Sequence, residues 1–356
     1  MSKIVIAGAG VLGAAIGRQL ALEGADVTLI DPAPGGRASP GSFAWLNASF
    51  AQDAQYNHLR HESLEIWRQM KDADPSVPVS FPGAILFEQK DFDLDAIEAS
   101  QADLGRPHAR LTGDDVAARE PAVTHPPGDA LLMAGDGYGD PVEITGWFLD
   151  QARQAGARVI AGEAVETIRL NSDNRVVGVA TASHDVPAEQ VILAAGIDLA
   201  DMLGKLDLHF AMDNQPGLLA KTSPGSSTTN AMLATPGVHC WQRPDRGFLI
   251  GASFGGDMRA MAAPETKAAE VLTALRQAIA GTEDCEIEDI TVRVRPMPAD
   301  GRPAIGPLGP DGLYVVCTHS GMTLAPVIAE MVTREIAGTP DPRLAPYRPD
   351  RAALAG

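Results

Sequence analysis

Residues 4–31 read IVIAGAGVLGAAIGRQLALEGADVTLID and decide the fold of the chain. An apolar strand is followed by a glycine-rich turn, a helix and a second strand. Gly8 allows a sharp turn out of the strand, Gly10 lets a pyrophosphate approach the backbone, and Gly13 lets the helix pack close to the sheet. Free N–H groups at the start of the helix attract phosphate oxygens. The stretch therefore predicts a βαβ unit that binds a dinucleotide.

Both ends of this unit supply further candidate contacts. Val11 and Leu12 begin the helix and are candidate cofactor contacts. Asp31 ends the second strand, where a carboxylate binds the hydroxyl groups of a ribose. The pattern fits NAD and FAD equally well, because both contain an ADP moiety. A glycine-rich turn without a ligand, in another kind of α/β protein, is the alternative interpretation.

Charge excludes several classes of partner. The 356 residues include 46 acidic and 28 basic side chains, which give a formal net charge of −18. Such a surface repels polyanions, so we expect no nucleic-acid partner and no attachment to anionic membranes. A small anionic substrate is compatible with this charge, because local arginines can dominate the potential inside a pocket. Apolar residues make up 45% of the chain, which is enough for a substantial core.

Cysteine usage and the N-terminus bear on the compartment. Cys240, Cys285 and Cys317 are far apart and form no CxxC pair, so we expect neither a disulfide framework nor a zinc site, and no other metal site. The first residues enter a strand at once, without the basic and apolar regions of a signal peptide. No apolar stretch is long and unbroken enough to span a membrane. These features predict a cytoplasmic protein.

The rest of the chain alternates helices and strands. A loop rich in Gly, Pro and Ser follows Asp31, where a simple NAD domain has a short helix, and it is long enough to lie along an extended cofactor. Short strands between Gly/Pro turns at 209–255 predict an antiparallel sheet. The apolar patterns predict helices at 56–70, 93–105, 112–120 (with Thr112 as N-cap), within 136–160, at 264–280 and at 322–338 with a Gly C-cap, a hairpin at 164–181, and a buried strand at 188–196.

Five segments occur in an order that is typical of one family. They are GAGVLGAAIG (8–17), GDPVEITGWFLDQARQAGARV (139–159), VILAAG (191–196), RVRPMPADGRPAIGPL (293–308) and THSGMTLAP (318–326). With these segments the chain resembles the FAD-dependent D-amino-acid oxidase family, which includes glycine oxidase, sarcosine oxidase and the D-amino-acid dehydrogenases. The first segment is shared by many nucleotide-binding proteins, whereas the order of the last three is far more specific. The resemblance covers nearly the whole chain and implies FAD rather than NAD.

The resemblance also implies a domain organisation. The fold class expected is α/β, with a Rossmann-type FAD-binding domain and an inserted α+β substrate domain built on an antiparallel sheet. The chain crosses between the two domains several times, so both are discontinuous. The FAD-binding domain is expected at 1–82, 141–208 and 291–356, and the substrate domain at 83–140 and 209–290.

The reaction implied is oxidation of a C–N bond. The substrate is a small amine or amino acid, such as a D-amino acid, glycine or an N-methyl amino acid. A hydride moves from its carbon to flavin N5, and water hydrolyses the resulting imine. The electron acceptor is oxygen or another acceptor, such as a quinone or a protein in a dehydrogenase. The same fold would also suit oxidation of the C–O bond of a 2-hydroxy acid, or a flavin-binding subunit of a larger complex. The sequence predicts no oligomeric state.

Arg295 is the first catalytic candidate. In the segment VRVRP, Val292 and Val294 alternate with Arg293 and Arg295, so the two arginines share one face of a strand. An arginine that faces a pocket binds a substrate carboxylate through two parallel hydrogen bonds. In the glycine-oxidase branch an arginine before this proline has that role, and Arg295 matches it. The alternative is a salt bridge at the surface or between domains. Arg302, in the following loop, is expected to have a structural role.

His239 and Trp241 are the other catalytic candidates. They alternate to one side of the segment VHCWQ. This segment resembles the family strand whose side chains line the substrate face of the flavin, with a histidine and an aromatic residue at matching positions. His239 is a candidate to accept the amine proton. The alternative is a histidine that merely has its hydrogen bonds satisfied in an apolar strand.

The remaining candidates contact the cofactor. The turn THSG places backbone N–H groups at the start of a helix, where they can face the flavin pyrimidine edge on which negative charge develops. The segment 42–48 is expected to pass near the isoalloxazine ring. Ser42, or Arg37 and Ser39 in its place, is expected to touch phosphate. The candidates are Arg37, Ser39, Ser42, Trp45, Asn47, Val165, Ala195, Gly196, Arg295, His319, Ser320, Gly321, Met322 and Thr323.

Three departures from the family pattern carry information. In the sarcosine-oxidase branch a cysteine binds the flavin covalently at the position of Arg293, so we expect non-covalent FAD here. That branch also has a lysine near the flavin that helps to activate oxygen, and its counterpart is Leu249. Oxygen reactivity is therefore open. The second arginine that glycine oxidases place before the last helix is absent from the turn THSG.

Overall fold

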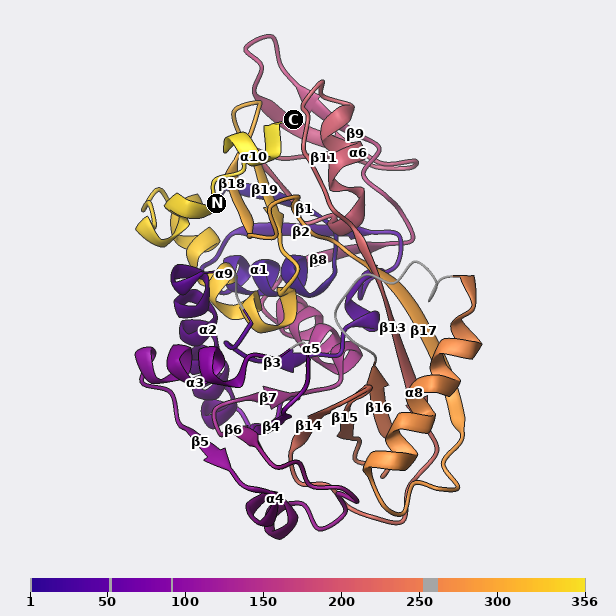
Figure 1. Cartoon of the computed structure of the whole chain (residues 1–356). Coiled ribbons are helices and arrows are strands. Elements are labelled where there is room, and N and C mark those ends of the chain that lie inside the picture. The colour runs from indigo at the N-terminus through magenta and orange to yellow at the C-terminus, as the bar shows by residue number, and fades with distance from the viewer. Residues whose placement is uncertain (1, 51–52, 91, 252–261, 356) are drawn as a thin grey trace.

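The computed structural model describes residues 2–50, 53–90, 92–251 and 262–355 (Figure 1). The strands are β1 (Lys3–Ala7), β2 (Asp26–Asp31), β3 (Trp45–Leu46), β4 (Ala84–Phe87), β5 (His108–Leu111), β6 (Ala130–Met133), β7 (Gly137–Tyr138), β8 (Arg158–Ala161), β9 (Thr167–Leu170), β10 (Val176–Ala180), β11 (Asp185–Pro187), β12 (Gln190–Leu193), β13 (Gln215–Thr222), β14 (Met232–Thr235), β15 (Val238–Gln242), β16 (Phe248–Gly251), β17 (Ile287–Arg295), β18 (Ala304–Pro307) and β19 (Leu313–Cys317). The helices are α1 (Val11–Leu22), α2 (Ala54–Ala73), α3 (Leu94–Asp103), α4 (Gly113–Arg119), α5 (Pro141–Gln154), α6 (Leu199–Gly204), α8 (Pro264–Ala278), α9 (Gly321–Ile336) and α10 (Ala352–Ala355), with 3-10 helices η1 (Ser39–Gly41), η2 (Gly196–Asp198) and η3 (Pro342–Tyr347).

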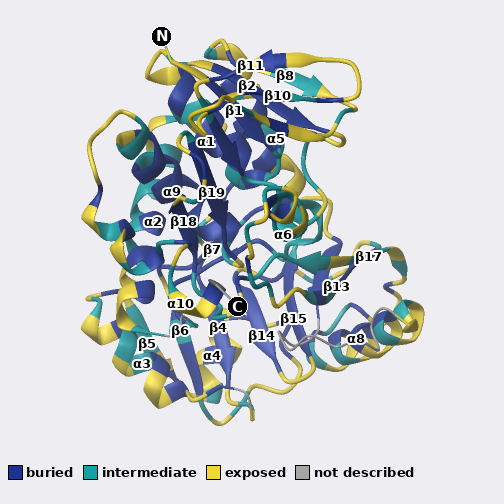
Figure 2. Ribbon diagram, turned by 90° about the horizontal axis from the view of Figure 1, so that it is seen from above, coloured by how far each residue is buried: buried dark blue, intermediate teal, exposed yellow. Residues whose placement is uncertain are grey.

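A six-stranded sheet is formed around the opening βαβ unit. Its order is β18-β19-β12-β1-β2-β8, and its neighbours are parallel except at the β18 edge. Ile4 and Ile6 of β1 pack with helices α1, α5 and α9, whereas Val5 and Ala7 pack with the three-stranded sheet β11-β10-β9. Both faces are covered, as a parallel sheet of apolar strands requires. The central strand β1 is accordingly buried in Figure 2.

The inserted region forms an eight-stranded sheet. Its order is β17-β13-β16-β15-β14-β4-β6-β5. Neighbouring strands are antiparallel, as predicted, except that β14 and β4 are parallel. This parallel pair joins the two segments of chain that form the region, through Met232 beside Ala84 and Ala234 beside Leu86. The sheet is therefore mixed, because the two segments enter it from separate crossings of the chain.

Strand β17 passes beyond one expected domain boundary. It pairs with β13 along its length, from Ile287 opposite Thr222 to Arg295 opposite Gln215. The boundary expected between residues 290 and 291 thus lies inside a continuous strand of the eight-stranded sheet. Figure 1 shows β13 and β17 side by side between the six-stranded sheet and strands β14–β16. Arg295 consequently belongs to the larger sheet, and we place the boundary after it.

The predicted helices are present with shifted ends. Helix α2 extends the helix predicted at 56–70 to Ala54–Ala73, because the side chain of Asp53 accepts a hydrogen bond from the Tyr56 N–H at 2.9 Å and caps it. Thr112 caps α4 as predicted. Every helix in the described ranges is too short or too polar to cross a lipid bilayer.

Helix α9 starts with an unusual set of hydrogen bonds. Pro326 lies inside the helix and has no N–H to donate to the carbonyl of Met322, four residues earlier. The indole Nε1 of Trp67 on α2 donates to that carbonyl at 3.1 Å, and it also donates to the carbonyl of Thr323 at 3.1 Å. The hydroxyl of Ser63 donates to the Thr323 carbonyl at 2.6 Å. Side chains of α2 thus replace what the proline removes, and they fix the position of the first turn of α9.

This replacement predicts coupling between Trp67 and Pro326. Trp67→Phe leaves the buried Met322 carbonyl without a donor, which costs about 1–3 kcal/mol of unfolding free energy in addition to any loss of packing. In the Pro326→Ala background the new N–H can bind that carbonyl, so the same Trp67→Phe change costs about 1 kcal/mol less. Urea unfolding of the four proteins of this cycle measures the difference, and the packing contribution cancels. Equal costs in both backgrounds would contradict the assignment.

Candidate functional site

One large cavity connects the two sheets. It has a volume of about 1240 Å³ and is lined by the carboxyl ends of β1 and β12, the N-termini of α1 and α9, and strands β13, β15 and β17. Pockets for a single small ligand usually have about 300–1,000 Å³. The cavity therefore has room for an extended dinucleotide together with a small substrate.

The glycine turn is shaped by missing side chains. Gly8 has φ +109°, and a Cβ atom there would lie 2.3 Å from the carbonyl oxygen of Ala194 after β12. A Cβ atom on Gly13 would lie 2.0 Å from the carbonyl oxygen of Gly8. Any larger residue at either position would displace backbone. Gly13 does not line the cavity, so its contribution in the structure is close packing of α1 against the turn.

Asp31 holds the same turn from the end of β2. It lines the cavity, yet one of its carboxylate oxygens accepts a hydrogen bond from the Ala9 N–H at 2.6 Å and the other accepts one from the Ala33 N–H at 2.7 Å. Burial raises the pKa of Asp31, and the two N–H donors oppose that shift. The carboxylate thus stabilises the turn, and a ribose contact is an additional role that its remaining acceptor capacity permits.

A second loop covers the start of α1. Gly10 is the N-cap of this helix, and a Cβ atom on Gly36 would lie 2.8 Å from the Gly10 Cα. The hydroxyl of Ser39 accepts a hydrogen bond from the Val11 N–H at 3.1 Å. Ser42, the other serine expected at phosphate, instead accepts one from the Ala44 N–H at 3.0 Å. The structure therefore places Ser39, and not Ser42, at the N-terminus of α1.

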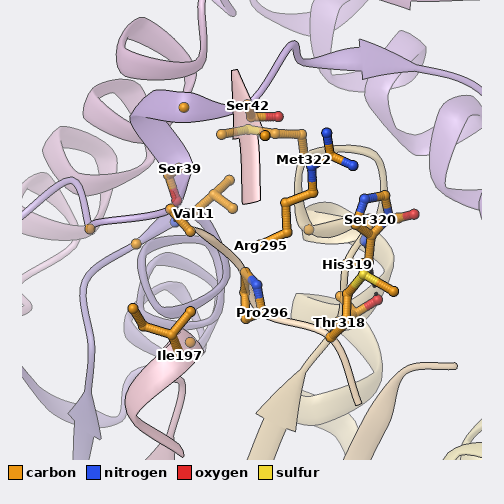
Figure 3. Close-up of a pocket in the computed structure, with 18 of the residues that line it drawn as sticks. Val11, Ser39, Ser42, Ile197, Arg295, Pro296, Thr318, His319, Ser320 and Met322 are labelled. Carbon is orange, nitrogen blue, oxygen red and sulfur yellow. Dashed lines mark hydrogen bonds between the residues drawn. The ribbon is translucent and has the colours of Figure 1, made fainter. Parts of the chain in front are cut away.

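The start of α9 lies next to the start of α1. A Cβ atom on Gly321 would lie 3.4 Å from Cγ1 of Val11. Ser320 is the N-cap of α9 but makes no side-chain capping bond, and the first turn has no acidic residue. Figure 3 shows Val11, Ser320 and Met322 around the same cavity. Two helix N-termini with positive dipole ends thus meet here, an arrangement suited to phosphate and to the charge of a reduced flavin.

His319 and Arg295 lie close together beside that turn (Figure 3). The His319 side chain is exposed toward the cavity, while the protein around it and the positive charges of Arg295 and Arg60 lower its pKa to about 4. The imidazole is accordingly neutral at pH 7. Burial also lowers the pKa of Arg295, which stays cationic because an arginine begins so high.

The Arg295 guanidinium rests on a glycine. A Cβ atom on Gly217 of β13 would lie 2.6 Å from one terminal nitrogen of Arg295 and 2.8 Å from its Nε. Only a glycine at this position leaves that space for the guanidinium. Arg293, two residues earlier on β17, packs its Cγ against Gly41 and does not line the cavity. The two arginines that the sequence places on one strand face therefore have different surroundings.

His239 and Trp241 also have different surroundings. His239 is buried at the cavity wall, stacked on Phe92 with ring centroids 5.9 Å apart. Trp241 does not line the cavity, which corrects the expectation of a role beside the flavin. Its Nε1 donates to the carbonyl of Phe43 at 3.1 Å, and its ring stacks on Tyr138 at 4.6 Å. His239 and Trp241 share one face of β15, but Trp241 lies two residues further along the strand, where the 43–45 segment covers it.

Asn47 depends on an arginine that sequence reasoning missed. Arg60 donates from Nη2 to the Asn47 side-chain oxygen at 2.8 Å and from Nε to the Asn47 carbonyl at 3.0 Å. It is buried and lines the cavity from α2. A signal for it exists in the sequence, because Arg60 follows Tyr56 by one helical turn and so lies on the buried face of α2.

Trp45 depends on a buried ion pair that was also missed. It lines the cavity, and its Nε1 donates to one carboxylate oxygen of Asp136 at 2.9 Å. The other oxygen accepts from Arg106 at 2.9 Å, and Arg106 also donates to Gln101 at 2.7 Å. Gln101 in turn donates to the carbonyl of Ala48 at 3.1 Å. This buried network fixes the 45–48 segment at the cavity.

The cavity gathers most of the predicted residues. Leu249, matched to the oxygen-activating lysine, is buried and does not line it. Arg302 does not line it either and forms an ion pair with Asp53. In the described part of the chain no group of three or more His, Cys, Asp or Glu residues is arranged to hold a metal ion. The predicted residues that line the cavity are Gly8, Gly10, Val11, Leu12, Asp31, Arg37, Ser39, Ser42, Trp45, Asn47, Val165, Ala195, Gly196, His239, Arg295, His319, Ser320, Gly321, Met322 and Thr323.

Comparison with known proteins shows which protein family the chain matches. The profile of the family described as FAD dependent oxidoreductase (DAO) matches residues 3–335. The chain is 26% identical over 390 residues to the glycine oxidase of Pseudomonas putida, covering 98% of this chain and 99% of that protein. It superposes on the L-amino acid deaminase of Proteus vulgaris with its insertion deleted, with a TM-score of 0.87, 18% identity and coverage of 98% and 93%. Glycine oxidase of Bacillus cereus gives a TM-score of 0.85, 20% identity and coverage of 99% of both chains.

The lowered pKa of His319 predicts a pH dependence of stability. Between about pH 4 and 6.5 the unfolded state binds a proton at this residue and the folded state does not, so the unfolding free energy falls as the pH falls through that window. His319→Asn removes this contribution, and its unfolding free energy should fall less steeply with acid than that of the wild type. Urea unfolding at several pH values measures the slopes. The exposed residue His58 serves as control, and a His58→Asn variant with the same flattened slope would contradict the assignment.

Proposed function

Because the chain belongs to the FAD dependent oxidoreductase (DAO) family, we propose that it oxidises the C–N bond of an amino acid or a related carboxylated amine to an imine. Arg295 carries this proposal. Its guanidinium lines the cavity above Gly217 and close to His319, at the start of α9. A planar cation in that position suits the carboxylate of an amino acid. The names of the similar proteins, a glycine oxidase and an L-amino acid deaminase, agree with such a substrate.

The structure fits FAD by its backbone. A Cβ atom on Gly8 or Gly36 would collide with neighbouring backbone, and one on Gly10 would lie 3.1 Å from the Ser39 hydroxyl oxygen, so the turn at the N-terminus of α1 requires glycines. These residues would hold the pyrophosphate, and the first turn of α9 would face the flavin ring. The bound flavin supplies the acceptor for the hydride that leaves the substrate carbon.

The chain's own residues orient the substrate. Arg295 fixes the carboxylate, and the neutral imidazole of His319 adds no second charge beside it. The amine has to bind in its neutral form, because the nitrogen lone pair forms the C=N bond as the hydride leaves. His239 lines the cavity from β15, two strands away from the Gly217 of β13 on which Arg295 rests, so we do not assign it the amine proton. Orientation and exclusion of water are therefore the main contributions of the protein.

One observation bears on the electron acceptor that reoxidises the flavin. Leu249 replaces the lysine expected in an oxygen-reactive relative, and it is buried away from the cavity. This favours an acceptor other than oxygen over oxygen itself. Comparing peroxide formation with the reduction of an artificial dye by the same preparation distinguishes an oxidase from a dehydrogenase.

The two arginines of β17 provide a matched test of the carboxylate site. Arg295→Ala should weaken the apparent affinity for amino acids by about 30- to 1,000-fold, because a charge-assisted bidentate contact is lost. Arg293→Ala should leave the affinity within about twofold, because Arg293 does not line the cavity. Anaerobic stopped-flow measurement of flavin reduction against substrate concentration gives both values. Unchanged affinity in the Arg295 variant would remove its proposed role.

Non-covalent attachment of FAD gives an independent prediction. Arg293 stands where the covalent branch has cysteine. Its side chain packs on Gly41, but Arg293 itself does not line the cavity. Precipitation of the protein with acid should therefore release the yellow cofactor into the supernatant, and mass spectrometry of the protein should give the mass of the polypeptide alone. Yellow colour that stays in the pellet would show a covalent bond at another residue.

A further inference from the structure

We propose that the substrate carries a large apolar side chain, aromatic or branched aliphatic, which lies against Phe43, Phe92 and His239. This inference rests on the proposed function, since it takes an amino acid with its carboxylate on Arg295 as given. It adds the chemical class of the side chain, which neither the family nor the carboxylate site determines.

The first support is a wall of rings at one end of the cavity. Phe43, Phe50 and Phe92 all line it, together with the buried His239. His239 stacks on Phe92 at 5.9 Å with the ring planes 18° apart, and Phe43 meets the His239 ring edge-on at 6.5 Å. Phe50 lies 5.1 Å from Phe92. Such surfaces favour apolar and aromatic groups, which gain both area burial and ring contacts.

The second support is the distance between this wall and Arg295. His239 pairs with Gly251, and Gly251 pairs with Leu219, so the three lie in one row across adjacent strands. The Arg295 guanidinium rests on Gly217, two residues from Leu219 on β13. Two residues of a strand span roughly 7 Å. His239 also lies two strands across from Leu219, a further roughly 10 Å, so the backbones of Gly217 and His239 are about 12 Å apart. The Arg295 guanidinium, a long substrate side chain and the imidazole ring together fill such a distance, whereas glycine or alanine would leave part of it empty.

The third support is the floor between the two ends. Gly217 and Gly251 both line the cavity and carry no side chain. A Cβ atom on Gly251 would lie 3.0 Å from Cδ2 of Leu219 and 3.7 Å from Cδ2 of Phe43. The Arg295 guanidinium thus lies over Gly217, and Leu219 lies over Gly251 with Phe43 beside it. The floor between the guanidinium and the aromatic wall is therefore apolar.

Charge narrows the class further. Among the described residues, the acids that line the cavity are Asp31, Asp198 and Asp201. Asp31 ends β2, and the other two lie at η2 and α6, so all three belong to the nucleotide end. The substrate end thus offers no described carboxylate to a basic side chain, and the nearby Arg60 and Arg295 are cations. Lysine and arginine are therefore disfavoured as substrates.

The test uses the FAD-loaded protein under anaerobic conditions. Flavin reduction is followed with both enantiomers of alanine, leucine, phenylalanine, lysine and glutamate, and with glycine. We expect the best apolar substrate to exceed alanine by about 10- to 200-fold in reduction rate over apparent dissociation constant. Binding of 3-phenylpropanoate and propanoate, followed by the change in flavin absorbance, should show a preference of similar size without any turnover.

Variants assign the preference to the wall. Phe92→Ala should lower the ratio of phenylalanine to alanine, and of phenylpropanoate to propanoate, at least about tenfold. Phe92→Leu should restore most of it. Phe81→Ala is the matched control, because Phe81 does not line the cavity and has Arg68 over its ring at 5.0 Å. That variant should keep the wild-type ratios.

The outcomes separate the two proposals. A flavin that no amino acid reduces, and that neither carboxylate perturbs, overturns the proposed function. Reduction by glycine or alanine at least as good as by every large apolar substrate overturns this inference and leaves the proposed function standing. An equal effect of Phe92→Ala on all substrates also overturns it, because the wall would then contribute structure and not selectivity.

Discussion

Two helices begin at the same place in this molecule, and the rest of the site depends on that contact. Helix α1 follows β1 and α9 follows β19, two strands of one parallel sheet. Their first residues are neighbours, since a Cβ atom on Gly321 would lie at the ordinary contact distance of 3.4 Å from Cγ1 of Val11. The N–H groups that we propose for the phosphates and for the flavin ring therefore lie at adjacent points of one cavity. The bonds from Ser63 and Trp67 to the start of α9, and from Asp31 to the glycine turn, all serve to hold this pair of helix ends in place.

The fold was predictable wherever the determining contacts are local. The glycine turn, α1 and α9 could be read from spacing within a single segment, since a tight turn and an uncapped helix start leave direct marks in the sequence. The parallel pairing of β14 with β4 could not, because it joins strands of four residues from distant parts of the chain. The same reason explains why the boundary expected between residues 290 and 291 falls within β17. Its membership of the larger sheet is decided by the partner strand β13, and the sequence of β17 itself does not reveal that partner.

The site was predictable to a similar depth. Residues next to a recognisable turn line the cavity as expected, but those that support them from elsewhere were missed. Arg60 contacts Asn47 from α2, and Asp136 contacts Trp45 from the turn between β6 and β7. The expectation that Trp241 lies beside the flavin failed for a different reason. Alternation along a strand tells which face a side chain occupies, but it does not tell which neighbouring loop will lie over it.

The placement of Arg295 on β17 separates two properties of the enzyme. The guanidinium, Gly217, Gly251 and the ring of His239 all belong to one continuous sheet, so their mutual spacing is fixed by its backbone ladder. The helix ends that we propose to face the cofactor follow strands of the six-stranded sheet. Under the proposed function, changes inside the larger sheet alter which molecule is recognised. Changes where the two sheets meet at the cavity alter how closely that molecule approaches the flavin, so recognition and turnover are open to independent adjustment during evolution.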